Sequence, residues 1–179
     1  MLRILVILTC LGAWPANGGE ESTIIETIVS DHILRGFTDL ATETEALKLA
    51  ANKDCSANST ALHAAWYRAF DAWVSVSHLR FGPSETNDRA FALAFWPDTR
   101  GFTPRSLQTL IDNQDPIANS LGEFGEVSIA ARGFYALEFL LFDPTISTLG
   151  DATYRCKLVR IITADVDANA DAILTDWMD

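Results

Sequence analysis

The chain has 179 residues, of which 49% are hydrophobic and 10% aromatic, enough for one well-packed core. Its 24 acidic residues outnumber 13 basic ones, and the formal net charge is -11. Because no basic stripe is present to displace counterions from a phosphate backbone, this composition excludes nucleic acid as a partner.

The first residues have the pattern of an export signal. Arg3 supplies a positive start, and the apolar run over residues 4–14 is too short to span a bilayer. Small residues follow at Ala16 and Gly18, so we place the cleavage site of the signal near Gly18. We therefore predict a signal peptide over residues 1–18, a mature lobe over residues 19–179, and a location in the bacterial periplasm or cell envelope.

The cysteines support export. Cys10 lies in the predicted signal, and a lipid anchor there is disfavoured because Thr9 stands where a small Ala, Gly or Ser is usual. Cys55 and Cys156 are left in the mature chain. In an oxidising compartment the simplest expectation for two cysteines is a disulfide, although two buried thiols or a reactive pair remain alternatives.

Helical spacing dominates the first half of the mature chain. Thr23 and Glu26 form a capping box that predicts the start of a helix over residues 23–52. Its apolar positions recur at steps of three and four, and they are Val29, Ile33, Phe37, Leu40, Thr44, Leu47 and Ala51. A second helix is predicted over residues 59–79, with Trp66, Phe70 and Trp73 on one stripe.

The region 84–125 is less regular. A short helix is expected over residues 88–95, and Pro97 then ends the helical pattern. Thr103 followed by Pro104 predicts an N-cap and first turn for another short helix that ends near residue 113.

Two further long helices are predicted. One spans residues 126–142 and contains Glu138, and the other starts at Asp151 and runs to the end of the chain. The sequence therefore predicts an all-α fold, a four-helix bundle with an irregular excursion between the second and third long helices. Because the apolar stripe of the last helix reaches Trp177, we expect either a shortened chain or a partner surface.

Glu138 is the most informative residue. Apolar residues surround it at nearly every helical angle, so the pattern predicts a helix that is buried almost all round. A buried carboxylate without a partner costs several kcal/mol. Two interpretations follow: Glu138 belongs to a site, or it lies at the rim of a helix–helix contact with its head in water.

Two neighbours bear on the choice. Gly133 is placed by the pattern in mid-helix, where glycine costs about 1 kcal/mol relative to alanine, so it is expected to admit a close neighbour such as another helix or a ligand. Tyr135 lies three residues before Glu138, so on a helix its phenol and the carboxylate can face the same position. Separate interface roles for both are the alternative.

A second polar group surrounds a proline turn. Trp96, Asp98 and Arg100 either build the wall of a pocket or serve structure, with Asp98 and Arg100 paired to each other. Arg100 is one possible counter-ion for Glu138. The other candidates are Arg68, Arg80 and Arg89.

Among the histidines, His32 borders the apolar stripe of the first helix and is the best metal-ligand candidate, together with Glu138. The dedicated zinc spacings H-E-x-x-H and C-x-x-C are absent, as are P-loop, Rossmann and G-x-S-x-G patterns.

These residues together resemble the imelysin family. Residues 131–142, ARGFYALEFLLF, are similar to the segment around the family's G-x-H-x-x-E motif. Further similar segments are FGP at 81–83, FWPD at 95–98, HIL at 32–34, and the pattern YRC…DW from 154 to 177. The combination spans most of residues 24–178.

The resemblance implies an exported all-helical protein of the periplasm or outer membrane, in a family with iron-uptake-associated members and insulin-cleaving metallopeptidases. It also implies two helical lobes with a site near the motif. The chain departs from the family at two points. Tyr135 occupies the position of the motif histidine, and the chain has about half the usual length, as expected for the N-terminal lobe alone.

Three functional hypotheses follow. The first is a non-catalytic binding protein for iron or another cation, centred on Glu138 with the polar groups named above around it, since ferric iron accepts phenolate and carboxylate oxygen. The second is a metal-dependent peptidase, which needs more clustered ligands than the sequence offers. The third is a structural module that binds a second helical lobe or another envelope partner.

Overall fold

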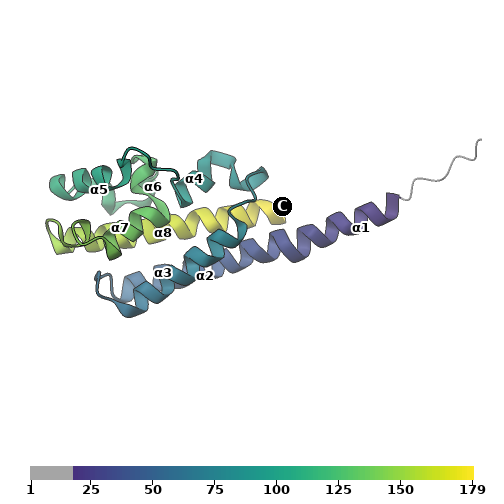
Figure 1. Ribbon diagram of the computed structural model, residues 1–179, viewed down its shortest axis with the longest axis horizontal. Helices are drawn as coiled ribbons and strands as arrows, with labels where there is room; N and C mark the ends of the chain where they lie inside the picture. Colours follow the sequence, from purple (N-terminus) through teal and green to yellow (C-terminus); the bar gives the residue numbers. More distant parts are fainter. Residues whose placement is uncertain (1–17) are drawn as a thin grey trace, which may run out of the picture.

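The computed structural model describes residues 18–179, and this part of the chain is all-α. One continuous helical rod opens it, consisting of α1 (Gly18–Ile28), a π-helical segment (Val29–Leu34) and α2 (Arg35–Lys53). Figure 1 shows α1 extending beyond the rest of the molecule. The predicted signal peptide lies almost wholly outside the described residues, as does Cys10.

Two other helices pack along this rod, and a third packs on one of them. Both α3 (Thr60–Val76) and α8 (Ala152–Met178) lie along α2, and α7 (Gly133–Phe142) lies on α8 (Figure 1). The predicted stripe of the first helix is confirmed, because its members from Ile33 onward are buried. The core therefore sits between these helices.

The excursion between α3 and α7 consists of short elements. They are 3-10 turns at Gly82–Ser84, Thr86–Asp88, Pro116–Asn119 and Ile129–Ala131, and helices α4 (Arg89–Leu93), α5 (Phe102–Asn113) and α6 (Leu121–Phe124). A last 3-10 turn at Ile146–Thr148 leads into α8. None of the described helices is long and apolar enough to cross a membrane.

Two predicted helix starts are confirmed by their caps. The side chain of Ser59 accepts a hydrogen bond from the amide of Leu62 at 3.4 Å, and that of Asp151 accepts one from Tyr154 at 2.8 Å. The start predicted at Thr23 is wrong, because the chain is already helical at Gly18.

The helix predicted over residues 126–142 is too long at its start. The chain makes a 3-10 turn, Arg132 is extended with φ -113 and ψ 166, and α7 begins only at Gly133. Gly133 is thus the first residue of the helix rather than a mid-helix residue. Its φ of +75 lies in the left-handed region that favours glycine.

The close neighbour expected at Gly133 is the backbone of α4. A Cβ atom there would overlap the carbonyl oxygens of Ala92 and Leu93 and would lie 2.6 Å from the carbonyl carbon of Leu93. Glycine is required here both by its φ and by this approach. The contact places the start of α7 directly against the end of α4.

A buried ion pair holds the same point to α8. The guanidinium of Arg132 donates from Nε to Oδ2 of Asp165 at 2.9 Å and from Nη2 to Oδ1 at 2.7 Å. The side-chain amide of Asn169 also donates to Oδ1 of Asp165 at 3.3 Å. Bidentate geometry with further hydrogen bonds is the arrangement in which a buried ion pair offsets its desolvation.

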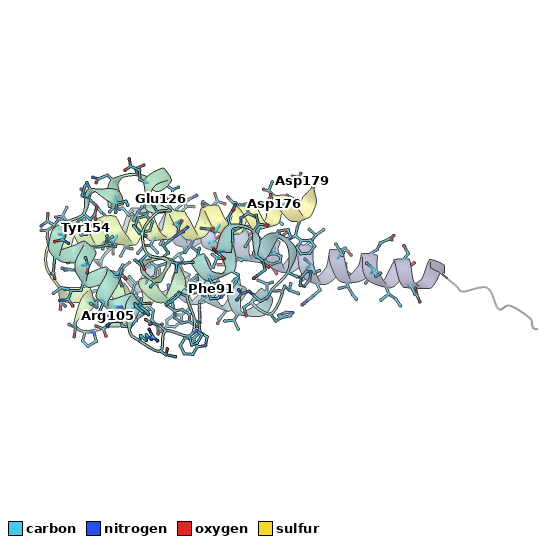
Figure 2. The ribbon with its side chains drawn as sticks, turned by 90° about the horizontal axis from the view of Figure 1, so that it is seen from above. Phe91, Arg105, Glu126, Tyr154, Asp176 and Asp179 are labelled. Carbon is cyan, nitrogen blue, oxygen red and sulfur yellow. A yellow bond between two sulfur atoms is a disulfide. The ribbon has the colours of Figure 1, made fainter. Side chains whose placement is uncertain are left out.

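The C-terminal end of α8 packs on the chain itself. The ring of Trp177 stacks on Phe37 with centroids 6.4 Å apart and meets Phe81 edge-on at 5.7 Å. Near it, Arg89 donates to Asp176 at 2.6 Å. Figure 2 shows Asp176 and Asp179 at this end and Tyr154 at the opposite end of the helix.

The predicted disulfide is confirmed. Cys55 follows α2, Cys156 lies in the first turns of α8, and the two are bonded with their Cα atoms 5.2 Å apart. The bond joins positions separated by 101 residues. Such bonds are typical of oxidising compartments.

We expect the double variant Cys55→Ser/Cys156→Ser to lose about 4–5 kcal/mol of unfolding free energy, because a bond across a loop of this length restricts the unfolded chain. Urea titration of the oxidised wild type and of the variant measures the difference. Equal midpoints and slopes for the two proteins would contradict the expectation.

We expect Gly133→Ala to lower the unfolding free energy by about 3 kcal/mol, since alanine is strained at positive φ and collides with α4. Gly125→Ala is the matched control, because Gly125 has a φ of -58 and its added methyl group would meet no atom within 4 Å. The control should be neutral or slightly stabilised. Equal destabilisation of both variants in urea titrations would show that the α4 contact is not the cause.

Candidate functional site

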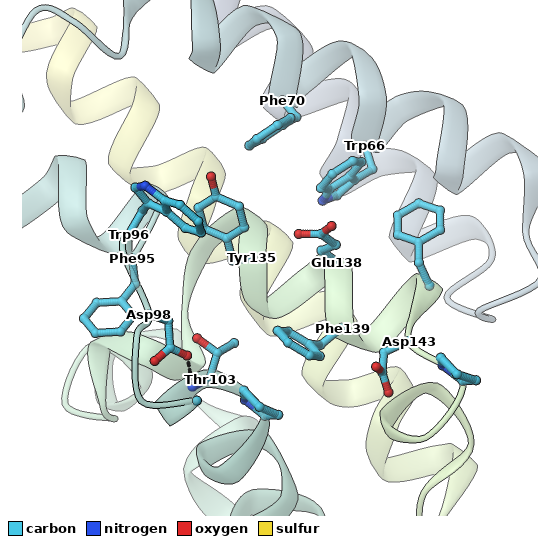
Figure 3. Close-up of a pocket in the computed structure, with 14 residues that line it drawn as sticks. Trp66, Phe70, Phe95, Trp96, Asp98, Thr103, Tyr135, Glu138, Phe139 and Asp143 are labelled. Atoms are coloured by element: carbon cyan, nitrogen blue, oxygen red, sulfur yellow. Dashed lines mark hydrogen bonds between the residues drawn. The ribbon is translucent and has the colours of Figure 1, made fainter.

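A pocket of about 720 Å³ surrounds Glu138 (Figure 3). Three walls form it: one face of α3, one face of α7 with the residues after it, and the segment from α4 into α5. Its lining residues, which define the Glu138 pocket, are Trp66, Phe70, Phe95, Trp96, Asp98, Gly101, Thr103, Pro104, Tyr135, Glu138, Phe139, Phe142, Asp143 and Pro144.

The α7 wall is set by helical spacing. Leu137, Leu140 and Leu141 are buried in the core, whereas Glu138 is exposed and Tyr135 half-buried. The expectation of a helix buried almost all round is therefore wrong, because α7 buries one side and turns Tyr135 and Glu138 into the open pocket. Figure 3 shows the Glu138 carboxylate near the rings that line it.

The α3 wall is aromatic. Trp66 stacks on Phe70 with centroids 5.0 Å apart and an interplanar angle of 11°. The indole Nε1 of Trp66 donates to the backbone carbonyl of Phe134 at 3.2 Å. This bond satisfies the buried indole and ties α3 to the start of α7.

The third wall follows α4. Trp96 is 66% exposed, and its ring lies 5.7 Å from that of Tyr135. The peptide bond between Trp96 and Pro97 is cis. Asp98 then accepts hydrogen bonds from the amides of Phe102 and Thr103, both at 2.8 Å, so that Asp98 rather than Thr103 caps the start of α5.

Three carboxylates line the pocket, and two of them have structural partners. Burial acts to raise the pKa of Asp98, but the amide hydrogen bonds outweigh it and hold the pKa below its usual range. Asp143 accepts from the amides of Thr145 and Ile146 at 2.9 and 2.8 Å. Among the described residues, none donates a hydrogen bond to Glu138 or forms an ion pair with it.

Tyr135 keeps its proton to higher pH than a free phenol. Burial raises its pKa, and the charge of Glu138 raises it further. The phenol is therefore neutral at physiological pH and can donate one hydrogen bond into the pocket.

Four of the predicted site residues are brought together, namely Glu138, Tyr135, Trp96 and Asp98. Arg100 is exposed and does not line the pocket, and the predicted pairing of Asp98 with Arg100 is not formed, since both carboxylate oxygens of Asp98 face α5 amides. The other candidate counter-ions have partners elsewhere, which are Glu43 for Arg68, Glu85 for Arg80 and Asp176 for Arg89.

His32 lies apart from the pocket. It belongs to the π-helical segment, and its Nε2 is 3.1 Å from Nε2 of His78. Within residues 18–179 no group of three or more His, Cys, Asp or Glu side chains is arranged to hold a metal ion. The predicted metal pair of Glu138 and His32 is therefore not assembled at one point.

Part of the lining does not follow from the sequence pattern. Periodicity places Trp66 and Phe70 on the core stripe of α3, and the sequence predicts for Asp143 only that a helix ends there. A signal for the first two exists, because their spacing of four places both rings on one helix face. Which face meets a cavity depends on tertiary packing, which periodicity does not reveal.

Fold and pocket define an all-helical lobe with an aromatic, acidic cavity. Residues 33–179 match the family model described as Imelysin, so the chain belongs to the imelysin family. It is 28% identical to the iron-regulated protein A of Synechococcus elongatus over 162 residues, which cover 90% of this chain and 39% of that protein.

A solved structure supports the fold. The crystal structure of an imelysin-like protein from Psychrobacter arcticum matches with a TM-score of 0.79 at 20% identity, covering 94% of this chain and 53% of that one. The chain thus spans about half, or less, of the length of these two relatives.

We expect Glu138→Gln to lower the pKa of Tyr135, while leaving it above 10.0 because burial is the larger cause. An NMR titration measures this pKa from the ring-carbon resonance of Tyr135, which is assigned by comparison with Tyr135→Phe. An unchanged pKa in the variant would show that the two groups do not interact.

The raised pKa also has a consequence for stability. Because the pKa of Tyr135 is higher in the folded state, the neutral phenol contributes stability below pH 10.0 that is lost as pH rises through the folded pKa.

Proposed function

We propose that this lobe is a non-catalytic binding module of the cell envelope, associated with uptake of iron or another cation, and that it binds its ligand in the Glu138 pocket. The observation that carries the proposal is the unpaired Glu138 carboxylate inside a preformed cavity. A concave, mostly apolar pocket with few polar groups is the usual form of a small-ligand site.

The relatives support the iron association. The curated relative is named an iron-regulated protein, and the family match covers most of the chain. Export is supported by the predicted signal peptide and by the Cys55–Cys156 bond, which suits an oxidising compartment.

A metal-dependent peptidase is the weaker hypothesis. A catalytic zinc site uses three protein ligands, and metal-assisted hydrolysis also needs an activated water. Around Glu138 the described residues offer its carboxylate and the neutral Tyr135 phenol, and Asp98 and Asp143 are engaged by backbone amides. This donor set does not fit a closed metal site, so a metal held here would need further ligands brought with it. A structural or partner-binding role is the third hypothesis, and it requires no ligand.

Calorimetric titration of the purified protein tests the proposal, with ferric nitrilotriacetate, zinc chloride and phenethylammonium chloride as separate cation probes. We expect at least one to bind saturably and Glu138→Gln to weaken it at least tenfold, about 1.4 kcal/mol. Glu126→Gln is the control, because Glu126 is exposed outside the pocket. Binding unaffected by Glu138→Gln, or no binding of any probe, would reject the proposal.

A further inference from the structure

We propose that the Glu138 pocket selects a small organic cation, an amine or amidinium group on an apolar body, over a bare metal ion. The charged head would lie at the Glu138 carboxylate, and the body would lie against the surrounding rings (Figure 3). This inference rests on the proposed function, and it narrows the class of ligand from any cation to an organic cation.

The lining is predominantly aromatic. Seven of its fourteen residues carry aromatic rings, and they come from all three walls. Trp66 and Phe70 contribute one stacked pair, and Trp96 and Tyr135 contribute a second pair of rings 5.7 Å apart. The ring of Phe70 lies 5.8 Å from that of Tyr135, so the two pairs join into one aromatic wall beside Glu138 (Figure 3). Aromatic faces attract ammonium and guanidinium groups, and indole attracts them most strongly.

All of the described charged residues that line the pocket are acidic. Its lining contains Asp98, Glu138 and Asp143, and none of the described residues that line it is Lys, Arg or His. The chain as a whole is also acidic, with a formal net charge of -11. The pocket therefore repels anions and attracts cations.

Glu138 is the carboxylate most open to a direct ion pair, since both oxygens of Asp98 and Oδ1 of Asp143 already accept backbone amides. Asp98 and Asp143 each accept two backbone amides, whereas Glu138 has no partner among residues 18–179. A carboxylate beside aromatic faces pairs with one positive group while the rings cover its apolar substituent. Charge-assisted hydrogen bonds from an ammonium group to a carboxylate are among the stronger polar contacts.

The same features disfavour a bare metal ion. Hard cations are held by several oxygen ligands, and transition metals by imidazole, thiolate or carboxylate groups. Aromatic rings supply none of these, and the described lining offers a metal ion one unengaged carboxylate, Glu138, and one phenol, Tyr135. An organic cation needs one counter-charge and an apolar surface, which is what the pocket presents.

Three probes that share a phenylethyl body and differ in the charge of the head group test the proposal: phenethylammonium, neutral 2-phenylethanol and anionic 3-phenylpropanoate. Binding is measured by calorimetry and by tryptophan fluorescence. We expect the cation to bind at least tenfold more tightly than the alcohol, and the anion to bind more weakly than either.

Variants separate charge from ring contacts. Glu138→Gln should remove the preference for the cation over the alcohol while leaving binding of the alcohol unchanged. Trp96→Leu should weaken the cation more than the alcohol, and because Trp96 is 66% exposed we expect this variant to fold. Glu126→Gln should match the wild type, and circular dichroism checks the fold of each variant.

The outcomes distinguish this inference from the proposed function. Saturable binding of ferric or zinc ion that depends on Glu138, with no binding of phenethylammonium, would overturn the inference and leave the proposed function standing. Equal affinity for the cation and the alcohol would also overturn it. Failure of every probe in both experiments would reject both.

Discussion

The backbone contact between Gly133 and the end of α4 is the constraint on which the pocket depends. It brings the first residue of α7 against the carbonyls of Ala92 and Leu93, closer than any side chain permits. The chain leaves α4 directly into the segment that carries Trp96, and it enters α7 directly before Tyr135 and Glu138. One contact thus sets the distance between two walls of the cavity. The Arg132–Asp165 ion pair then holds this junction to α8.

The apolar residues around Glu138 form the lining of an open pocket, whereas the sequence pattern suggests a buried helix. An isolated carboxylate in an apolar run points to burial, and burial would demand a counter-ion. In the fold, α7 is covered on one side only, and the aromatic residues on its open side line a cavity rather than the core. The carboxylate therefore avoids the full desolvation cost while keeping apolar surroundings. Such a group is stable without a partner and still able to bind one.

Sequence patterns predict the all-α class, the caps at Ser59 and Asp151, and the disulfide, because each depends on local chemistry or on simple counting. The proximity of Tyr135 to Glu138 also follows from helical spacing. The start of α7 does not, since the positive φ of Gly133 accompanies a contact with α4, which is distant in the sequence. For the same reason periodicity does not distinguish a pocket wall from a core stripe at Trp66. His32 fails as a partner of Glu138 because the two lie on helices whose relative placement no local pattern specifies.

The bond between Cys55 and Cys156 also has a topological consequence. Every residue that lines the Glu138 pocket lies between these two positions, so the cavity is built entirely within one covalent ring of the chain. The helical rod of α1 and α2 precedes this ring, and most of α8 follows it. A single cut in any exposed turn inside the ring leaves all walls of the cavity joined in one molecule. The cavity walls are thus held together by connectivity as well as by packing.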